Sequence, residues 1–443
     1  MSSCMISAPC GPVRGTEDAG IRVFRGIPFA CAERFEKPRP LPVWREVFDA
    51  AESETDCPQY GSYRAETDKI GAFYHKEFRG SLASRYAENP LTLNIVAPSD
   101  ARGCGVLAFI HGGGFETGTV GELPYGTCTE YAQRGVVFVS IGYRLNVFGL
   151  YGGRNLCLYD QLEAVRWLRA NIAAFGGDPD RITLAGQSAG AMCIWDLCLT
   201  DALKGSVRGA VLMSGGGLIP RVIGPRKPSR SEKFWRSVAR LAGADSEQAL
   251  KALPAETVWN AWFSALQTKR SIHDAQPEID GTLIPDVPQR VFRRSDGLGI
   301  PMIFDVTSQD FVAPVLYRAA LHAALFRSRK GFASYGYFFD RMPPGGSYKA
   351  FHGVDLWYLF GKMEQSWRPF GAADRRLSDE MIRCVCQFVN SGDPNGEGLP
   401  HWPAVSPRQK GFRLFDGRSD GLIRPAACCR KTLRSLLFDR GPM

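Results

Sequence analysis

The feature that most restricts the fold is a glycine-rich pentapeptide, GQSAG at residues 186–190, which lies between a strand-like run and a helix-like run. The strand is the apolar run ITLA at 182–185, and a helical segment is expected at 191–200. A serine in such a turn is held in a strained backbone conformation, with its hydroxyl above the edge of a sheet. The pattern therefore predicts a sheet in which Ser188 occupies a tight strand-to-helix turn.

Other apolar runs predict the rest of this sheet. The expected strands are 105–110, 136–141, 210–213, 301–306 and 335–339, together with 182–185. Most are short and aliphatic and end in glycine or polar residues, as buried strands do. Between the strands at 136–141 and 182–185, apolar residues of 160–174 recur at helical spacing, and a last long helix is expected at 376–389. Strands and helices that alternate in this way predict an α/β fold whose mostly parallel sheet is flanked by helices on both faces.

One internal segment, residues 217–298, has a different pattern. It is rich in helix signals and poor in strands, and SRSE at 229–232 has the form of a helix-capping box. We interpret this segment as a helical cap inserted between strands of the sheet. Neither a Gly/Ser linker nor an internal repeat is found in the sequence. The simplest organisation is a single domain over residues 1–443 with the cap inside it.

Charge and cysteine content argue against several functional classes. The net charge of +9 comes from scattered Lys and Arg, whereas nucleic-acid-binding proteins usually concentrate them on one face. The N-terminus lacks the basic and apolar regions of a signal peptide, and no apolar run approaches the ~20 residues of a membrane span. The 13 cysteines, an odd number without periodic spacing, indicate neither a disulfide framework nor a zinc site. We expect a cytoplasmic monomer or small homo-oligomer without metal, nucleic-acid or membrane partners.

The serine of the pentapeptide is the candidate nucleophile. Small neighbours let other backbone approach Ser188 closely, and the N-terminus of the following helix favours negative charge that develops beside it. An ordinary glycine-rich turn is the alternative, because such pentapeptides often arise by chance. The strand before Ser188 and the helix after it favour the catalytic interpretation.

A second glycine-rich segment, HGGGF at 111–115, directly follows an expected strand. A glycine run exposes backbone N–H groups without side chains, and such groups stabilise the tetrahedral oxyanion of acyl transfer. We predict an oxyanion hole formed by the N–H groups of Gly113, Gly114 and Ala189. A flexible loop is the alternative. His111 precedes the serine in the chain and is interpreted as a loop anchor rather than a catalytic base.

These segments resemble the type-B carboxylesterases, a family that includes bacterial para-nitrobenzyl esterases and the cholinesterases. Further similarity runs over nearly the whole chain, in FRGIPFA at 24–30, NLCLYDQ at 155–161, NIAAFGGDP at 171–179, GDPN at 392–395 and WP at 402–403. The resemblance implies an α/β-hydrolase fold and a serine esterase that needs neither metal nor organic cofactor.

The resemblance also implies the other two catalytic residues. AFHGVDLWYLFG at 350–361 is similar to the family segment that bears the catalytic histidine, which corresponds to His352. IFDVTSQD at 303–310 is similar to the segment that bears the acid, which corresponds to Asp310. The order nucleophile, acid, histidine is that of the fold. The alternatives left open are Asp305 and Asp280 for the acid and His401 for the histidine.

The chain departs from the family pattern at several positions near the expected site. Gln187 replaces the commoner Glu before the nucleophile, Asp305 replaces the usual Gly at a strand end, and Phe311 replaces the usual Gly after the acid. The family's early disulfide would involve Cys57, but its partner position is Pro90, so that bridge cannot form. Substrate specificity therefore cannot be transferred from relatives.

Aromatic residues are candidates for the substrate pocket. Phe115 adjoins the glycine run, and Trp259, Trp262 and Phe263 cluster in the expected cap. Core packing within the cap is the alternative for the cluster. The expected substrates are small-molecule carboxylic esters with short-to-medium acyl chains, aryl esters included. A lipase for longer acyl esters, a non-catalytic cholinesterase-like binding module and an amidase are the competing hypotheses.

Overall fold

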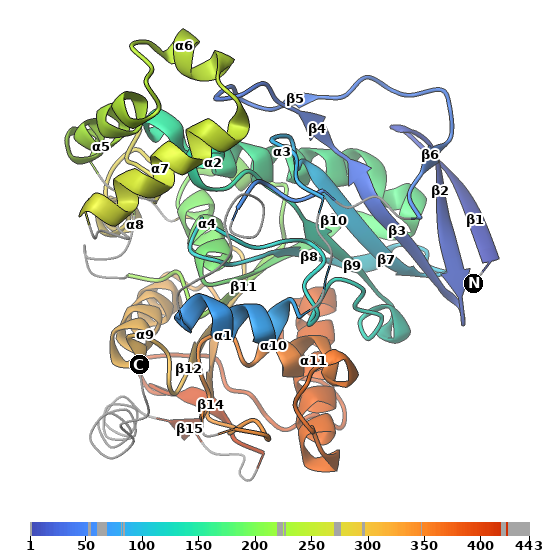
Figure 1. Ribbon diagram of the computed structural model, residues 1–443. Coiled ribbons are helices and arrows are strands. Elements are labelled where there is room, and N and C mark those ends of the chain that lie inside the picture. The colour runs from blue at the N-terminus through green and yellow to red at the C-terminus, as the bar shows by residue number, and fades with distance from the viewer. Residues whose placement is uncertain are drawn as a thin grey trace.

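The computed structural model describes residues 2–51, 55–59, 69–80, 82, 85–218, 225, 227–269, 276–294, 297–346, 348–417 and 422–423. Within them, one large sheet runs through the molecule, with helices on both of its faces (Figure 1). The sheet positions the candidate site, because the loops that follow parallel strands meet at one edge of a sheet.

Thirteen strands of the described residues form this sheet. In spatial order they are β1 (Ser2–Ala8), β2 (Gly11–Asp18), β3 (Ile21–Pro28), β7 (Thr92–Pro98), β9 (Val136–Ile141), β8 (Cys104–Ile110), β10 (Gly177–Gln187), β11 (Gly209–Met213), β12 (Met302–Thr307), β13 (Ser334–Phe339), β14 (Phe412–Phe415) and β15 (Leu422–Ile423). The thirteenth strand, β6 (Phe48–Asp49), pairs with β2 at the side of this order. Two further strands, β4 (Ala30–Cys31) and β5 (Arg39–Pro40), form a separate pair.

The strands from β9 to β14 in this order are parallel, and the other neighbouring pairs in this order are antiparallel. The added strand β6 pairs parallel with β2. Every strand expected from the sequence is found in β8 to β13. The prediction of a mostly parallel sheet is therefore confirmed.

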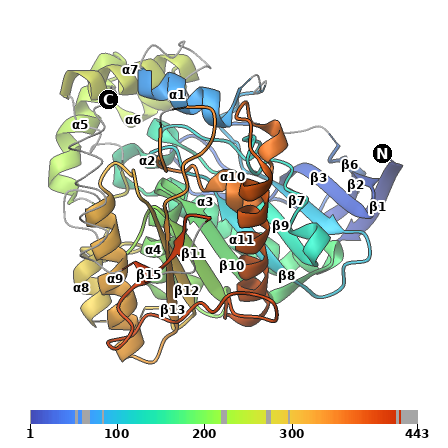
Figure 2. The ribbon, with the colours of Figure 1, turned by 90° about the horizontal axis from the view of Figure 1, so that it is seen from below.

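Helices cover both faces of the sheet (Figure 2). On one face lie α3 (Leu156–Asn171), α4 (Ala189–Cys198) and α9 (Ala313–Arg329), and on the other lie α10 (Leu356–Phe360) and α11 (Ala372–Ser391). Each face has its own apolar core, because successive side chains of a strand point to opposite faces. In β12, Phe304 belongs to one core and Ile303 to the other.

The two long helices expected from the sequence correspond to α3 and α11. The expected helix at 160–174 extends further at its start and ends at Asn171, where a 3-10 helix (Ile172–Phe175) continues the chain. In the described part of the chain, further 3-10 helices are Ala132–Arg134, Tyr151–Gly153, Asp201–Leu203 and Met363–Gln365. Two helices before the nucleophile complete this part of the fold, α1 (Lys69–Phe78) and α2 (Asn146–Leu150).

The described residues of 217–298 form four helices and no strand. They are α5 (Pro228–Leu241), α6 (Glu247–Ala252), α7 (Ala255–Lys269) and α8 (Pro288–Arg294). The capping box expected at 229–232 is wrong, because α5 already begins at Pro228. Proline is favoured at the first helical position, since its φ is preset and it has no N–H to satisfy there.

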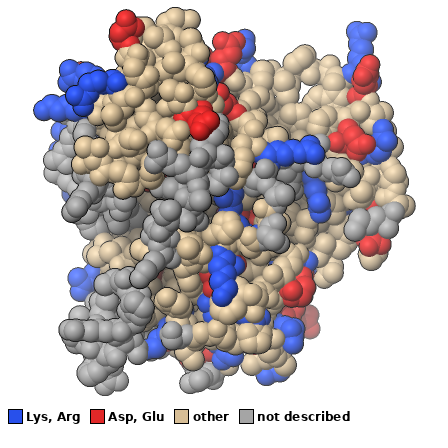
Figure 3. All heavy atoms as spheres, viewed as in Figure 1, with Lys and Arg blue, Asp and Glu red and all other residues tan. Residues whose placement is uncertain are grey.

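Charges of both signs are interspersed over the face shown in Figure 3, as the scattered Lys and Arg of the sequence indicate. In the described ranges, no helix combines the length and the apolar character that crossing a bilayer requires. The cysteines of the same ranges are free thiols, and Cys57 is among them. The family's early disulfide is therefore absent, as expected from Pro90.

Candidate active site

Ser188 occupies the turn between the last residue of β10 and the first residue of α4. Its backbone has φ 54° and ψ −120°, a conformation that non-glycine residues rarely adopt and that stores strain. Hydrogen bonds hold it there, from Ser188 N–H to Met213 O at 2.8 Å and from Met192 N–H to Ser188 O at 3.0 Å. The strand-to-helix turn expected from the pentapeptide is thus present, with a half-buried serine at its apex.

Close backbone contacts explain the glycines around this turn. A Cβ at Gly190 would lie 2.1 Å from the carbonyl oxygen of Ile110, and a Cβ at Gly215 would lie 2.4 Å from that of Ser188. No side chain fits such gaps. The turn is therefore packed directly against the end of β8 and the segment after β11.

The glycine run after β8 lies beside Ser188. A Cβ at Gly112 would be 3.0 Å from the Cβ of Ser188, which places this loop against the turn. Gly113 and Gly114 have φ values of 99° and 64° and are exposed. Among the described residues, no acceptor takes a hydrogen bond from either N–H group. Ala189 is the first residue of α4, so its N–H has no intrahelical partner.

His111 anchors this loop rather than facing a reaction partner. Its ring is 3% exposed, stacks on Tyr143 with centroids 4.5 Å apart, and has Nδ1 3.0 Å from Gly112 O. Burial lowers the pKa of His111 to about 4. A buried, neutral imidazole of this kind suits the anchoring role expected from the sequence.

His352 and Asp310 come together from two loops of the same sheet edge. Asp310 follows β12, His352 precedes α10, and the bridge between Gln309 and Phe351 joins the two loops. Nδ1 of His352 is 2.9 Å from Oδ2 of Asp310; the Asp310 side chain is buried, and the imidazole is 11% exposed. Burial alone would lower the pKa of His352, but the charge and the hydrogen bond of Asp310 outweigh it and raise that pKa. The pair can thus hold a proton on the imidazole, as a base with an orienting carboxylate does.

The other imidazole nitrogen of His352 faces the residue before the serine. Nε2 of His352 is 3.0 Å from Nε2 of Gln187. Because Nδ1 carries its hydrogen toward Asp310, Nε2 has a lone pair, which the Gln187 amide reaches as a donor. Within the described residues, no hydrogen bond joins Ser188 Oγ to His352. The structure therefore brings Asp310, His352 and Gln187 into one chain of contacts next to the serine.

Comparisons with known proteins agree with this arrangement. A family model described as the carboxylesterase family matches residues 2–335 and 310–420. The chain belongs to the carboxylesterase family. Para-nitrobenzyl esterase of Bacillus subtilis (strain 168) is 27% identical, over 94% of this chain and 95% of its own length. Phenmedipham hydrolase of Pseudarthrobacter oxydans is 28% identical, over 89% of this chain and 91% of its own.

Solved structures show the same fold for this carboxylesterase. A thermophilic PNB esterase superposes with a TM-score of 0.84 at 25% identity and covers 97% of this chain and 99% of its own. A carboxylesterase of Geobacillus stearothermophilus superposes with a TM-score of 0.81 at 26% identity and covers 96% and 99%. The expected α/β-hydrolase fold and the expected enzyme class, a carboxylic ester hydrolase, are confirmed.

The alternative acids of this carboxylesterase lie elsewhere. Asp280 is engaged within its own loop, where it accepts hydrogen bonds from the backbone N–H groups of Thr282 and Ile284 at 2.9 and 2.8 Å. Asp305 is buried in β12, opposite Tyr337 of β13. The alternative histidine, His401, is exposed. Of the three acids, Asp310 is the one within hydrogen-bond distance of His352.

The predicted pocket residues are mostly in the core of this carboxylesterase. Trp259 and Trp262 are 0% and 1% exposed, and Phe263 stacks on Trp259 with centroids 5.4 Å apart. These contacts favour the packing alternative for the cluster. Phe115 is also buried, directly after the exposed glycines.

Sequence reasoning did not assign a role to an aromatic rim beside His352. The Phe311 ring is 4.9 Å from the imidazole of His352 and is 66% exposed, and the Tyr74 ring of α1 lies 6.2 Å from Phe311. A fully buried ion pair, Glu77 to Arg368 at 2.6 Å, fastens α1 over this region. The replacement of glycine by Phe311 was the one signal in the sequence that pointed to this rim.

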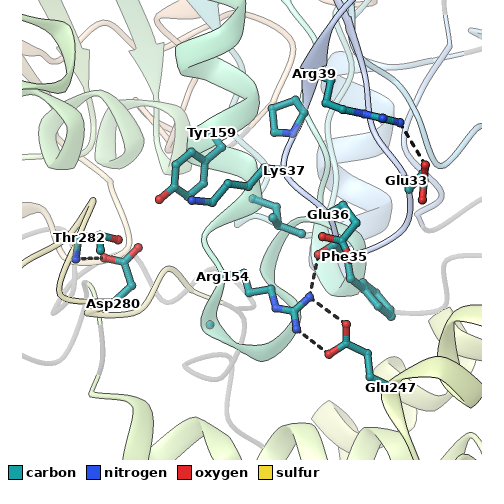
Figure 4. Close-up of a pocket in the computed structure, with 13 residues that line it drawn as sticks. Glu33, Phe35, Glu36, Lys37, Arg39, Arg154, Tyr159, Glu247, Asp280 and Thr282 are labelled. Carbon is teal, nitrogen blue, oxygen red and sulfur yellow. Dashed lines mark hydrogen bonds and ion pairs between the residues drawn. The ribbon is translucent and has the colours of Figure 1, made fainter.

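A separate hollow of about 820 Å³ lies among the β4–β5 pair, α3 and α6 (Figure 4). Four of its charged side chains pair with one another, in the bidentate contact of Arg154 with Glu247 and the contact of Arg39 with Glu33. No member of the candidate catalytic set lines it. In the described ranges, His, Cys, Asp and Glu side chains form no cluster that could hold a metal ion.

Proposed function

We propose that this carboxylesterase cleaves esters through an acyl-enzyme, with Ser188 as nucleophile, His352 as base and Asp310 as orienting acid. The observation that carries the proposal is the His352–Asp310 pair at 2.9 Å beside a serine in a strained turn. Gly113, Gly114 and Ala189 supply the oxyanion-hole N–H groups. Each such donor contributes about 3 kcal/mol of transition-state stabilisation.

The reaction starts when His352 Nε2 exchanges the Gln187 amide for the Ser188 hydroxyl. His352 then takes the Oγ proton, Oγ attacks the ester carbonyl, and the imidazolium returns the proton to the leaving alcohol. Water then enters and gives a proton to His352 as its oxygen attacks the acyl carbonyl. When the tetrahedral intermediate collapses, the imidazolium returns this proton to Ser188 Oγ and the acid is released. Asp310 stays ionised and holds the imidazole in the tautomer with Nδ1–H throughout.

The substrates are small-molecule esters with short-to-medium acyl chains, aryl esters included. The exposed ring of Phe311 beside His352 supports this, because an aryl alcohol or aryl acyl group can stack on it. Residues 1–443 act as one catalytic domain with 217–298 as its helical cap. No metal or organic cofactor takes part.

The test is a panel of para-nitrophenyl acetate, butyrate and palmitate, with wild type and Ser188→Ala in parallel. We expect fast hydrolysis of the two short esters, slow hydrolysis of palmitate, and no hydrolysis above background by Ser188→Ala. A fluorophosphonate probe should label wild type and not the variant. Equal activity of both proteins would remove Ser188 from the mechanism, a preference for palmitate would favour a lipase, and an unlabelled, inactive wild type would favour a binding module.

A further inference from the structure

Two buried carboxyl groups lie behind the candidate triad and take no part in the mechanism above. Asp305 of β12 is 2% exposed, and Asp355, directly before α10, is 0% exposed. Tyr337 connects the two groups, because it lies opposite Asp305 in the sheet and its hydroxyl donates to Asp355, and the two carboxyl groups influence each other's pKa. Neither makes an ion pair with Lys or Arg among the described residues. Two negative charges in such a place would repel each other strongly.

The hydrogen bonds around this pair are incomplete if both groups are charged. The Tyr337 hydroxyl donates to Oδ2 of Asp355 at 3.0 Å. In the described part of the chain, no side chain donates a hydrogen bond to Oδ1 of Asp355 or to either carboxyl oxygen of Asp305, and the other donors near them are the backbone N–H groups of Ser214 and of Asp355 itself. A proton on one carboxyl would turn this pair of acceptors into a donor and an acceptor.

The surroundings distinguish the two carboxyl groups. Asp355 accepts the Tyr337 hydroxyl and faces the imidazole of His352, and both neighbours favour its charged form. Asp305 receives no side-chain donor and faces the carboxyl groups of Asp355 and Asp310, which favour its neutral form. Of the remaining titratable neighbours, Tyr131 lies next to Tyr337 and is a buried phenol.

We propose that Asp305 is a neutral carboxylic acid that donates its proton to the Asp355 carboxylate, and that the pair bears one negative charge behind His352. Asp305 is then a positioning residue: it holds Asp355, and Asp355 holds the loop that starts at His352. The part that concerns His352 rests on the proposed function. Burial raises the pKa of both carboxyl groups, and the charges of Asp355 and Asp310 raise that of Asp305 further.

The proposal predicts how folding depends on pH. A carboxyl whose pKa is higher in the folded than in the unfolded state stabilises the fold fully below its unfolded pKa of about 4, and this stabilisation is lost as pH rises through the folded pKa. Asp305→Asn keeps an N–H donor to Asp355 and has no proton to lose. Between pH 5 and 9, the folding equilibrium constant of wild type should therefore fall relative to that of Asp305→Asn, by up to about tenfold per pH unit.

The experiment measures urea unfolding of wild type, Asp305→Asn and a matched surface control, Asp201→Asn, whose side chain is 85% exposed. The control should follow wild type at every pH. Parallel curves for wild type and Asp305→Asn would mean that Asp305 is charged when folded and would overturn the proposal. Because these measurements do not use enzyme activity, they test the protonation state of Asp305 even if the ester assays contradict the proposed function.

Two further readouts separate a proton-bearing role from simple packing. The infrared difference spectrum of folded wild type minus Asp305→Asn at pH 8 should contain the carbonyl stretch of one protonated carboxyl, beyond any band that other buried carboxyl groups such as Asp196 give in both proteins. Absence of any such band from wild type overturns the proposal even if the variant does not fold. In kcat/KM, the acid limb should stay in place in Asp305→Asn and move to lower pH by about 0.5–1 pH unit in Asp355→Asn, because His352 loses a nearby charge. A displacement of the limb in Asp305→Asn as large as that in Asp355→Asn would contradict the assignment of the proton.

Discussion

Gln187→Glu is the substitution that most directly probes the imidazole of His352. It places a carboxylate where the amide now lies, 3.0 Å from Nε2. Two unit charges about 3 Å apart interact by about 5 kcal/mol at an effective dielectric constant of about 20. Water at the partly exposed imidazole and relaxation of the side chains reduce this, so we expect the pKa of His352 to rise by about 1–2, equivalent to about 1.4–2.7 kcal/mol.

The sign of the effect on catalysis follows from the role that we propose for His352 as the base. His352 must be neutral to accept the serine proton, so a higher pKa moves the acid limb of kcat/KM to higher pH. Below the limb, kcat/KM should fall about tenfold for every pH unit by which the limb moves. The assay is the pH–rate profile for para-nitrophenyl acetate. Gln133→Glu, on the exposed surface, is the charge-matched control and should leave the profile unchanged.

An acid limb of Gln187→Glu that coincides with that of wild type would refute this reasoning. It would mean that ionisation of His352 does not control the rate, or that the side chain at position 187 is not in contact with the imidazole in the enzyme form that the pH–rate profile reports. Gln187→Ala separates the two cases. If the amide competes with Ser188 for Nε2, its removal should raise kcat by up to about fivefold, since the amide contact contributes about 1 kcal/mol.

Three further changes test the site and its support. Asp310→Asn should lower kcat by about 10⁴-fold and leave the urea midpoint near that of wild type, because it favours the wrong imidazole tautomer; kinetics at pH 8 check this, and wild-type turnover would exclude Asp310 as the acid. Arg368→Met leaves Glu77 unpaired in full burial and should lower the free energy of unfolding by about 3–5 kcal/mol; an unchanged calorimetric Tm would contradict the anchoring of α1. Trp262→Ala should also lower the free energy of unfolding by about 3–5 kcal/mol and leave the ratio of kcat/KM for the acetate ester to that for the butyrate ester unchanged. An altered ratio would place Trp262 in the pocket.

The central strands and the serine turn were predictable from the sequence because their signals are local. Short aliphatic runs that end in glycine identify β8 to β11, and the glycines at 186 and 190 leave room for one particular packing of backbone against backbone. The start of α5 was missed for an equally local reason. Pro228 and the serine that follows it are competing start signals, and the proline begins the helix.

Contacts between distant segments could not be predicted from the residues alone. The choice of Asp310 among three acids depends on a loop contact across 42 positions, and only the family resemblance pointed to it. The Gln187 contact depends on side-chain rotamers at the end of β10. Asp305 and Tyr337 become neighbours through the register of β12 on β13, which no pattern within either strand encodes.

Polar groups act on the imidazole of His352 from two sides. On the Nδ1 side, Asp310 supplies a full negative charge, and the Asp305–Asp355 pair lies behind it. On the Nε2 side, Gln187 offers a neutral donor. A neutral donor at Nε2 favours the unprotonated imidazole at rest, whereas the carboxylates favour the imidazolium that forms when the serine proton moves. The electrostatic support for His352 is therefore weighted toward the charged imidazolium of the proposed mechanism, and stabilisation of that state would raise the rate.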